Sequence, residues 1–401
     1  MSTPTSPFLE RQRTWKAEPV PSAPDEVFTS VARVDVLWLA KGLGPGGMEQ
    51  LLVAHARAAD HRFFRYQTAY LRPDKTHLVA ALEAAGVETT CLRCRRSWDL
   101  RWLAHLRGRL RSSRPAIVHC HSPLVAALAR LTVKTLPRSA RPALISTEHN
   151  TWDSFGSATR FLNRVTFDLD DDHLAVSEPV RASMPPSKQA SVTTVVHGID
   201  LDGVSAQRGQ RIAVRRELGL PHDAVVVGTV ANYRAQKDYP NLLESARRVL
   251  DVASNVWFIA VGQGPLEAEI MARHQQLRLG DRFRLLGYRP DATRIMSGFD
   301  VFTLASIHEG LPVAFMEARA LGLPVVVTRV GGLPEHVEHG VDGLLVEPRD
   351  PDELADAILR VSADEPARLR MGAASARRAA AYDAIVATRI VEAHYRSLVT
   401  R

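Results

Sequence analysis

The chain has 401 residues, of which 45% are hydrophobic and 24% are charged, and its formal net charge is +7. This length allows two domains of ordinary size. Apolar runs stay short of the roughly 18 residues that a membrane-spanning helix needs, and the N-terminus lacks the apolar segment of a secretory signal. The composition is that of a soluble globular protein, and we expect a cytoplasmic location.

Cysteine content and positive charge exclude several classes of function. Three cysteines do not make a disulfide framework. Cys91 and Cys94 form a C-x-x-C pair without the second pair of a zinc site, so metal or redox function there is disfavoured. The positive charge would suit nucleic acid, but aromatic-rich basic platforms and recognised nucleic-acid motifs are missing, and we expect no such partner. Residues 1–30 mix Pro, Ser, Thr and charge, as a disordered leader does.

An arginine-rich segment at residues 93–114 interleaves its basic residues with Trp98, Trp102 and several leucines. Basic residues beside Trp and Leu on a helix suit an anionic membrane surface. A helix with its apolar side in the core and a solvated basic back would give the same pattern. Both interpretations stay open, and the first predicts peripheral contact with the inner face of a membrane.

Short β-rich apolar runs alternate with helical stretches, which predicts βαβ units and parallel sheets. In the first half, strands are expected at residues 34–39, 65–71, 117–120, 143–146, 173–176 and 193–196, and helices at 48–59, 77–85 and 123–131. In the second half, strands are expected at residues 224–230, 256–261, 283–286, 301–305 and 323–327, and helices begin at Asn241 and Leu266.

The predicted fold class is therefore α/β, with two doubly wound, Rossmann-like domains that face each other across a cleft. We place the domains at residues 31–205 and 206–382, because a glycine- and glutamine-containing stretch between about 200 and 222 separates the two series. Such sheets bind ligands at the carboxyl ends of their strands. The expected site is the cleft between the domains.

Glu309 and Glu317 stand eight positions apart, directly after an apolar strand. Pro312 at a first helical position predicts that Glu309 lies in the loop and Glu317 in the second turn of a short helix. The amides of Leu311 and Val313 would point out of the helix N-terminus. This arrangement would bind a phosphate with amides and sugar hydroxyls with carboxylates. Two solvated surface glutamates beside an ordinary helix start would give the same spacing.

Further motifs surround this pair: VGQGPL at 261–266, LGY at 286–288, GGLPE at 331–335, GVDGLLV at 340–346 and DPDEL at 350–354. In this order and spacing the chain resembles the family 4 glycosyltransferases, which have the GT-B architecture and an E-x7-E motif. The resemblance covers roughly residues 33–400 and is densest from 225 to 355.

The resemblance implies a retaining, metal-independent hexosyltransferase that uses a nucleotide-diphosphate sugar, with UDP as the expected nucleotide and no cofactor. Residues 31–205 would form the acceptor side and residues 206–382 the nucleotide-sugar-binding domain. The last segment, 383–401, would return as a helix to the N-terminal domain. The acceptor is expected to be a glycan or a lipid-linked intermediate of polysaccharide or cell-envelope synthesis.

The glycine-rich run GLGPGG at 42–47 follows the first strand and opens a helix. Glycines let backbone approach a phosphate closely, and a helix start supplies amides. A dinucleotide loop or a tight turn would look alike, but a nicotinamide enzyme would place an acidic residue after the next strand. Asp60 instead ends the first helix. By resemblance, Gly46 and Gly47 line the cleft near the donor diphosphate and the acceptor.

Lys237 follows the first strand of the second domain and could neutralise a nucleotide-diphosphate leaving group. A lysine after a strand is also commonly just solvated. The resembled family usually has Arg five residues before this Lys, and this chain has Asn232 there. Arg234 would supply the missing cation from a shifted position.

Two histidines follow strands of the first domain. By resemblance, His149 matches a residue that contacts the donor sugar or phosphate. His121 lies in another loop after a strand and would line the acceptor side. His119 would point to the opposite face of the sheet and would be a buried residue with a structural role. Neither pair has spacing typical of a zinc site.

The resemblance also implies roles for the acidic motif. Glu309 would orient the donor sugar or help to bind the diphosphate, Glu317 would hold the ribose, and Gly310, Leu311 and Val313 would contact the donor. Glu309, His149 and Lys237 are the expected catalytic residues. No Asp-x-Asp motif follows a strand, and Asp170-Asp171-Asp172 is interpreted as a charged loop, so no metal site is predicted.

Three rival functions remain at this point. A GT-B sugar-nucleotide epimerase would keep the nucleotide site and need no acceptor. A glycosidase would use the two carboxylates for hydrolysis, but the phosphate-binding features would then be unexplained. A catalytically decayed nucleotide-sugar-binding protein would fit the Asn at position 232, although both glutamates and Lys237 are retained.

Overall fold

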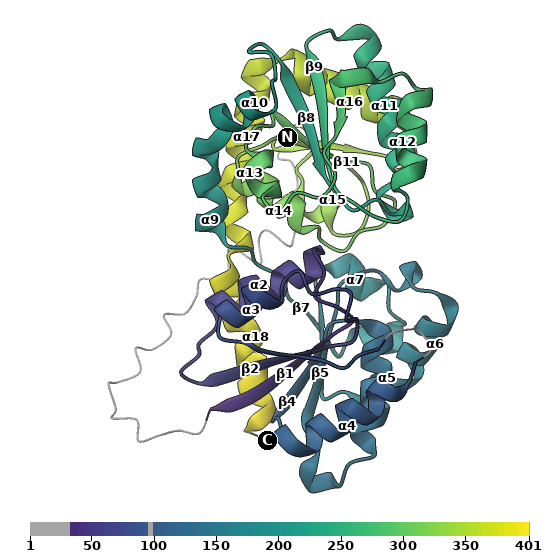
Figure 1. The fold of residues 1–401 in the computed structure, drawn as a ribbon, viewed down its shortest axis with the longest axis vertical. Helices are drawn as coiled ribbons and strands as arrows, with labels where there is room; N and C mark the ends of the chain where they lie inside the picture. Colours follow the sequence, from purple (N-terminus) through teal and green to yellow (C-terminus); the bar gives the residue numbers. More distant parts are fainter. Residues whose placement is uncertain (1–32, 95–98, 401) are drawn as a thin grey trace, which may run out of the picture.

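The computed structural model describes residues 33–94 and 99–400. It contains two lobes stacked along the long axis, each built on a parallel sheet covered by helices (Figure 1). The α/β class and the two doubly wound domains predicted from the sequence are confirmed. The expected leader at residues 1–30 lies outside the described residues.

The N-terminal sheet has seven parallel strands in the order β3-β2-β1-β4-β5-β6-β7. Their bounds are β1 Val34–Ala40, β2 Phe64–Tyr70, β3 Glu88–Cys91, β4 Ile117–Cys120, β5 Ala143–Glu148, β6 Asp172–Ala175 and β7 Val192–Thr194. The helices are α2 Gly47–Ala58, α3 Val79–Ala84, α4 Arg101–Ser113, α5 Pro123–Lys134, α6 Ser157–Thr166, α7 Glu178–Ala182 and α8 Pro186–Gln189. The edge strand β3 was not predicted, because its sequence ETTC is partly exposed and carries no apolar run.

The C-terminal sheet has six parallel strands in the order β10-β9-β8-β11-β12-β13. Their bounds are β8 Val225–Val230, β9 Val256–Val261, β10 Phe283–Leu285, β11 Val301–Leu304, β12 Val325–Thr328 and β13 Gly343–Val346. The helices are α9 Leu201–Ala206, α10 Arg211–Glu217, α11 Tyr239–Val252, α12 Glu267–Gln276, α13 Ala292–Met296, α14 Val313–Ala320, α15 Leu333–His336, α16 Pro351–Ala363, α17 Glu365–Arg378 and α18 Ala384–Val399. The prediction missed β13, which is buried but only four residues long.

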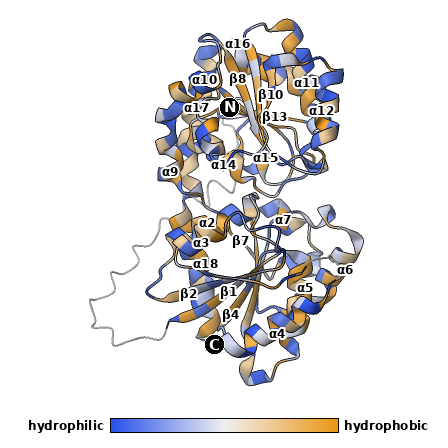
Figure 2. Ribbon diagram, viewed as in Figure 1, coloured by the Kyte–Doolittle hydropathy of each residue, from blue (hydrophilic) through white to orange (hydrophobic). Residues whose placement is uncertain are grey.

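Strand β1 shows why both faces of the first sheet are covered. Val36 and Trp38 enter one hydrophobic cluster, whereas Leu37 and Leu39 enter a second cluster on the opposite face. Successive side chains of a strand point to opposite faces, so a parallel sheet with two apolar faces needs helices on both. The covering helices accordingly alternate hydrophobic and hydrophilic segments (Figure 2).

The arginine-rich segment forms helix α4, whose apolar side faces the protein. Trp102, Leu106 and Leu110 are buried in the core, while Arg111 and other basic residues face outward. This packing favours the interpretation of a core helix with a solvated basic back, and membrane contact through this segment stays a prediction. Residues 95–98, including Trp98, lie outside the described residues. No helix in the described ranges is long and apolar enough to cross a bilayer.

Helix α18 follows the C-terminal domain in the chain but packs on α2 and β4 of the N-terminal domain (Figure 1). Glu392 accepts hydrogen bonds from the Tyr66 hydroxyl at 2.8 Å and from the amide of Asp60 at 2.9 Å. The Tyr395 hydroxyl accepts from the Trp38 indole at 3.2 Å. The chain therefore crosses between the lobes a second time, and buried polar contacts fix this crossing.

Candidate active site between the domains

The strand order of each sheet reverses once, between β1 and β4 in the first sheet and between β8 and β11 in the second. Ligands of doubly wound sheets bind outside the carboxyl ends of the strands at such a reversal. The loops after β1 and β4 carry Gly46, Gly47 and His121, and the loops after β8 and β11 carry Lys237 and Glu309. Topology thus places five of the predicted residues at the two reversal points.

A cavity of about 810 Å³ is lined by residues of both domains. Five predicted site residues line it: Gly46, Gly47, His121, His149 and Arg234. Its volume lies within the usual range of small-molecule sites, roughly 300–1,000 Å³. The two domains therefore enclose a space large enough for a ligand of nucleotide-sugar size.

Lys237 and Glu309 form an ion pair, with 2.5 Å between Nζ and Oε1. The side chains are 14% and 5% exposed, and the Ser306 hydroxyl donates to the same carboxylate oxygen at 2.6 Å. The amide of Ile307 also donates to the Gln236 carbonyl at 2.9 Å. These bonds hold together the two loops at the C-terminal reversal point. The expected convergence of Lys237 and Glu309 is present, although neither side chain is among those that line the cavity.

Glycines bring the two domains into close backbone contact beside this pair. A Cβ at Gly310 would lie 2.0 Å from the carbonyl oxygen of His149. A Cβ at Gly47 would lie 3.3 Å from the Val313 side chain at the start of α14. Leu51 of α2 joins the core cluster of the C-terminal domain. The predicted residues of one domain therefore lie directly against those of the other.

Glu317 lies apart from the ion pair, in the second turn of α14. Its carboxylate accepts a hydrogen bond from the Thr293 hydroxyl at 3.0 Å. Burial raises the pKa of Glu317 to about 7, and the Thr293 hydrogen bond opposes this rise. The helix begins at Val313 with Pro312 as its N-cap, one position later than predicted. Leu311 is buried beside it.

The predicted His121 and His149 form a row of rings with His197; His121 is buried and the other two are half-buried. His121 Nδ1 lies 3.3 Å from His149 Nε2, and the His149 ring stacks on His197 with centroids 4.9 Å apart. Burial lowers the pKa of each of these three rings, so all three are neutral near pH 7. His119 points into the protein and contacts the hydroxyls of Tyr395 and Thr147, as expected of a structural residue.

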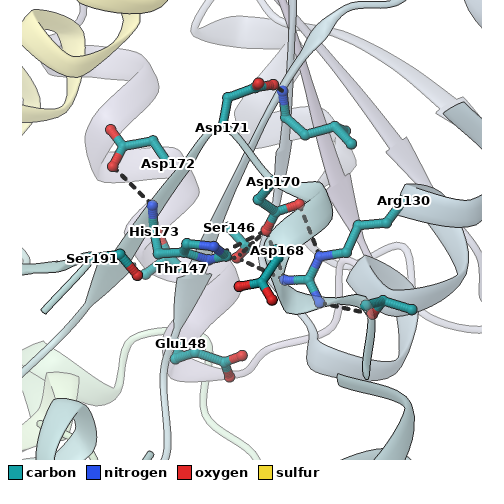
Figure 3. Close-up of polar contacts among 12 residues, drawn as sticks. Arg130, Ser146, Thr147, Glu148, Asp168, Asp170, Asp171, Asp172, His173 and Ser191 are labelled. Atoms are coloured by element: carbon teal, nitrogen blue, oxygen red, sulfur yellow. Dashed lines mark hydrogen bonds and ion pairs between the residues drawn. The ribbon is translucent and has the colours of Figure 1, made fainter. Parts of the chain in front are cut away.

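The acidic run at 170–172 lies in the loop before β6 and at the first residue of that strand, as the sequence suggested, but its carboxylates are bonded to other segments. Asp170 is buried and accepts two hydrogen bonds from Arg130, at 2.8 and 2.7 Å (Figure 3). Asp171 accepts from the amide of Leu144 at 2.8 Å, and Asp172 opens β6. Buried charges need partners, and the partners of the Asp170 and Asp171 carboxylates lie on α5 and β5. These carboxylates therefore connect α5 and β5 to the start of β6. They support the strand that ends beside His149.

Several residues that line the cavity had no predicted role. Lys75 follows β2, Glu49 lies in the first turn of α2, and Glu267 opens α12. The sequence could have indicated Lys75 only by its position after a strand. Many solvated lysines share such a position, so it does not distinguish a site residue. Burial raises the pKa of Glu49, while Lys75 and Arg234 act to lower it.

Two family models match the chain. Residues 45–202 match the model described as Glycosyltransferase Family 4, and residues 210–378 match that of Glycosyl transferases group 1. The chain belongs to glycosyltransferase family 4. The resemblance inferred from the sequence motifs is confirmed, and the protein is a glycosyltransferase.

Curated relatives of this glycosyltransferase differ in the acceptors that their names state. The UDP-Gal:alpha-D-GlcNAc-diphosphoundecaprenol alpha-1,3-galactosyltransferase of Escherichia coli is 25% identical over 73% of this chain and 78% of its own length. The 2-deoxystreptamine glucosyltransferase of Streptomyces kanamyceticus is 26% identical over 80% of this chain and 81% of its own.

Solved structures establish the fold. Anabaena HepE, in complex with UDP and glucose, has a TM-score of 0.78 at 21% identity and covers 91% of this chain and 100% of its own. A glycosyltransferase from Rickettsia africae has a TM-score of 0.75 at 15% identity, covering 92% and 99%. This glycosyltransferase therefore has the GT-B fold.

Replacing Gly310 by Ala should separate the two walls of the cavity. The added Cβ would clash with the backbone of His149, and backbone cannot yield as a flexible side chain does. We expect Gly310→Ala to lower kcat/KM for sugar transfer by roughly tenfold or more, because small misplacements of reacting groups are costly. As a control, Gly108→Ala adds a Cβ with no atom within 4 Å and should leave kcat/KM unchanged. Equal activity of the two variants would contradict the close contact between Gly310 and the backbone of His149.

Glu148 should make folding stability depend on pH. Burial raises its pKa from the ordinary value of 4.5 to about 7. The folded state therefore binds more protons than the unfolded state between these values, and this contribution to stability falls as pH rises through 7. Glu148→Gln should lose less stability than the wild type between pH 5 and pH 8 in urea unfolding. The exposed Glu347→Gln serves as control, and identical pH slopes for wild type and Glu148→Gln would refute the assignment.

Proposed function

We propose that this glycosyltransferase moves a sugar from a UDP-sugar to a glycan or lipid-linked acceptor of polysaccharide or cell-envelope synthesis, with retention of configuration and without a metal ion. The observation that carries the proposal is the meeting of Lys237 and Glu309 at the reversal point of one sheet, beside a cavity whose other wall is the glycine-rich loop of the second sheet.

Similar proteins support the choice of donor and acceptor. HepE was solved with UDP and with UDP-glucose. The Escherichia coli relative uses a UDP-sugar and a sugar linked through diphosphate to a lipid.

The C-terminal wall would hold the donor. Departure of UDP places negative charge on its diphosphate, and the Lys237 ammonium and the amides at the start of α14 would stabilise that charge. Glu309 would keep Lys237 in place and accept a hydrogen bond from a hydroxyl of the donor sugar. Glu317, which already accepts from Thr293, would hold the ribose.

The N-terminal wall would present the acceptor to the sugar. In this mechanism the bond between the anomeric carbon and the diphosphate oxygen breaks, and the acceptor oxygen bonds to the same face of that carbon. The proton of the acceptor hydroxyl passes to the leaving diphosphate. A neutral His149 can donate or accept a hydrogen bond at the sugar without adding charge.

The direct test is turnover of UDP-, GDP- and ADP-sugars by the wild type and by Glu309→Gln. We expect UDP release from a UDP-sugar, and a loss of roughly 100-fold or more in Glu309→Gln. The substitution keeps the shape of the side chain and its Ser306 contact, so the protein should still fold, at a stability lowered by the loss of one charge of the ion pair. Circular dichroism checks this, and Glu347→Gln, an exposed and similarly conservative change, should retain full activity.

The rival functions predict different results in the same assay. Isomerisation of the donor without any acceptor would identify an epimerase instead. Cleavage of sugar polymers without nucleotide binding would identify a glycosidase. Nucleotide binding with no turnover, unaffected by Glu309→Gln, would identify a decayed binding protein. Each of these outcomes would refute the proposal.

A further inference from the structure

The N-terminal wall of the cavity carries basic side chains for which the proposed mechanism has no use. Lys41 follows β1, and Arg72 and Lys75 follow β2. All three line the cavity, and β1 and β2 are adjacent in the sheet. The donor diphosphate, by contrast, is assigned to Lys237 on the opposite domain. The chain thus gathers positive charge on the N-terminal wall of the cavity.

The backbone and the aliphatic stem of Lys75 are held against the glycine-rich loop. The Lys75 carbonyl oxygen accepts from the amide of Leu43 at 2.9 Å, and its amide donates to the carbonyl of Arg72 at 3.2 Å. The aliphatic stem lies across the glycine-rich loop, since a Cβ at Gly42 would be 3.0 Å from Lys75 Cβ and one at Gly44 would be 3.6 Å from its Cδ. Two glycines of the loop therefore make room for this lysine.

The positive charges of Lys75 and Lys41 are not neutralised by ion pairs with the described residues. Within residues 33–94 and 99–400 neither ammonium lies within salt-bridge distance of a carboxylate, whereas Arg72 is held by both oxygens of Asp74 at 2.7 and 2.8 Å. Glu49 lies on the same wall and feels the charges of Lys75 and Arg234. Lys75 is half-buried and has no ion-pair partner in the part of the chain that the structure describes, and such a cation favours an anionic ligand over a neutral one.

We propose that the acceptor carries a phosphate or diphosphate group, and that Lys75 holds this group together with Lys41 and Arg72. The proposal rests on the proposed function and names the acceptor class of the same site. Two ammonium groups and a guanidinium fixed in orientation suit the several oxygens of a phosphate. The group would belong either to a free sugar phosphate or to the diphosphate of a lipid-linked sugar.

The test is calorimetry on protein saturated with UDP, so that the donor diphosphate site is filled. Glucose 1-phosphate is compared with methyl glucoside, and farnesyl-diphospho-N-acetylglucosamine with farnesyl N-acetylglucosaminide. We expect at least one phosphate-bearing ligand to bind roughly tenfold or more tightly than its neutral counterpart, the value of a charge-assisted hydrogen bond. Preference confined to the first pair indicates a soluble acceptor, and preference confined to the second indicates a lipid-linked one.

Lys75→Met keeps the aliphatic stem over Gly42 and removes the charge. It should raise the Kd of the phosphate-bearing ligand by roughly tenfold, leave the Kd of UDP unchanged and bind the neutral ligand as before. Lys134→Met, the same change at the exposed end of α5, should alter none of these values. This inference would be overturned if phosphate-bearing and neutral ligands bound equally, or if Lys75→Met had no effect. The proposed function would still stand in that case, provided that UDP binds. Failure of UDP itself to bind would instead refute the proposed function.

Discussion

The ion pair between Lys237 and Glu309 joins the loops after β8 and β11, which are neighbours at the point where the strand order of the C-terminal sheet reverses. Both side chains are nearly buried, and removing one partner of such a pair typically costs about 3–5 kcal/mol because the other charge is left alone. The pair therefore sets the shape of this corner of the sheet. Through the next residue, Gly310, it also sets where the C-terminal domain meets His149.

Charge is distributed unevenly over the site. The histidine row beside the cavity is held neutral by burial, so the cations of the site are lysines and arginines from the loops after the strands. Lys237 is compensated by Glu309 within its own domain, whereas Lys75 has no such partner among the residues described. A ligand that spans both walls would meet Lys237, which is neutralised by Glu309, on one wall and Lys75, which has no ion pair with any described residue, on the other. This asymmetry suits a reaction in which UDP leaves from one wall while an anionic acceptor stays on the other.

The sequence was sufficient to predict the fold and the neighbourhood of the site. Apolar runs of four to seven residues identified most strands, and the missed ones, β3 and β13, lie at the edges of their sheets, where a strand is short or half exposed. Lys237 and Glu309 were predicted to be neighbours because each follows a strand, and the carboxyl ends of parallel strands lie at the same edge of a sheet. The packing of Lys75 against Gly42 and Gly44 and the burial of the Asp170 side chain could not be predicted, since both depend on contacts between segments that are distant in the chain.

A crystal structure of the protein with UDP tests the central claim most directly, namely that the diphosphate is bound at the paired loops of the C-terminal domain. The expected result places a diphosphate oxygen within about 3 Å of Lys237 Nζ, with the ribose hydroxyls at Glu317. UDP bound away from the gap between the domains, with Lys237 still in contact with Glu309 alone, would contradict it.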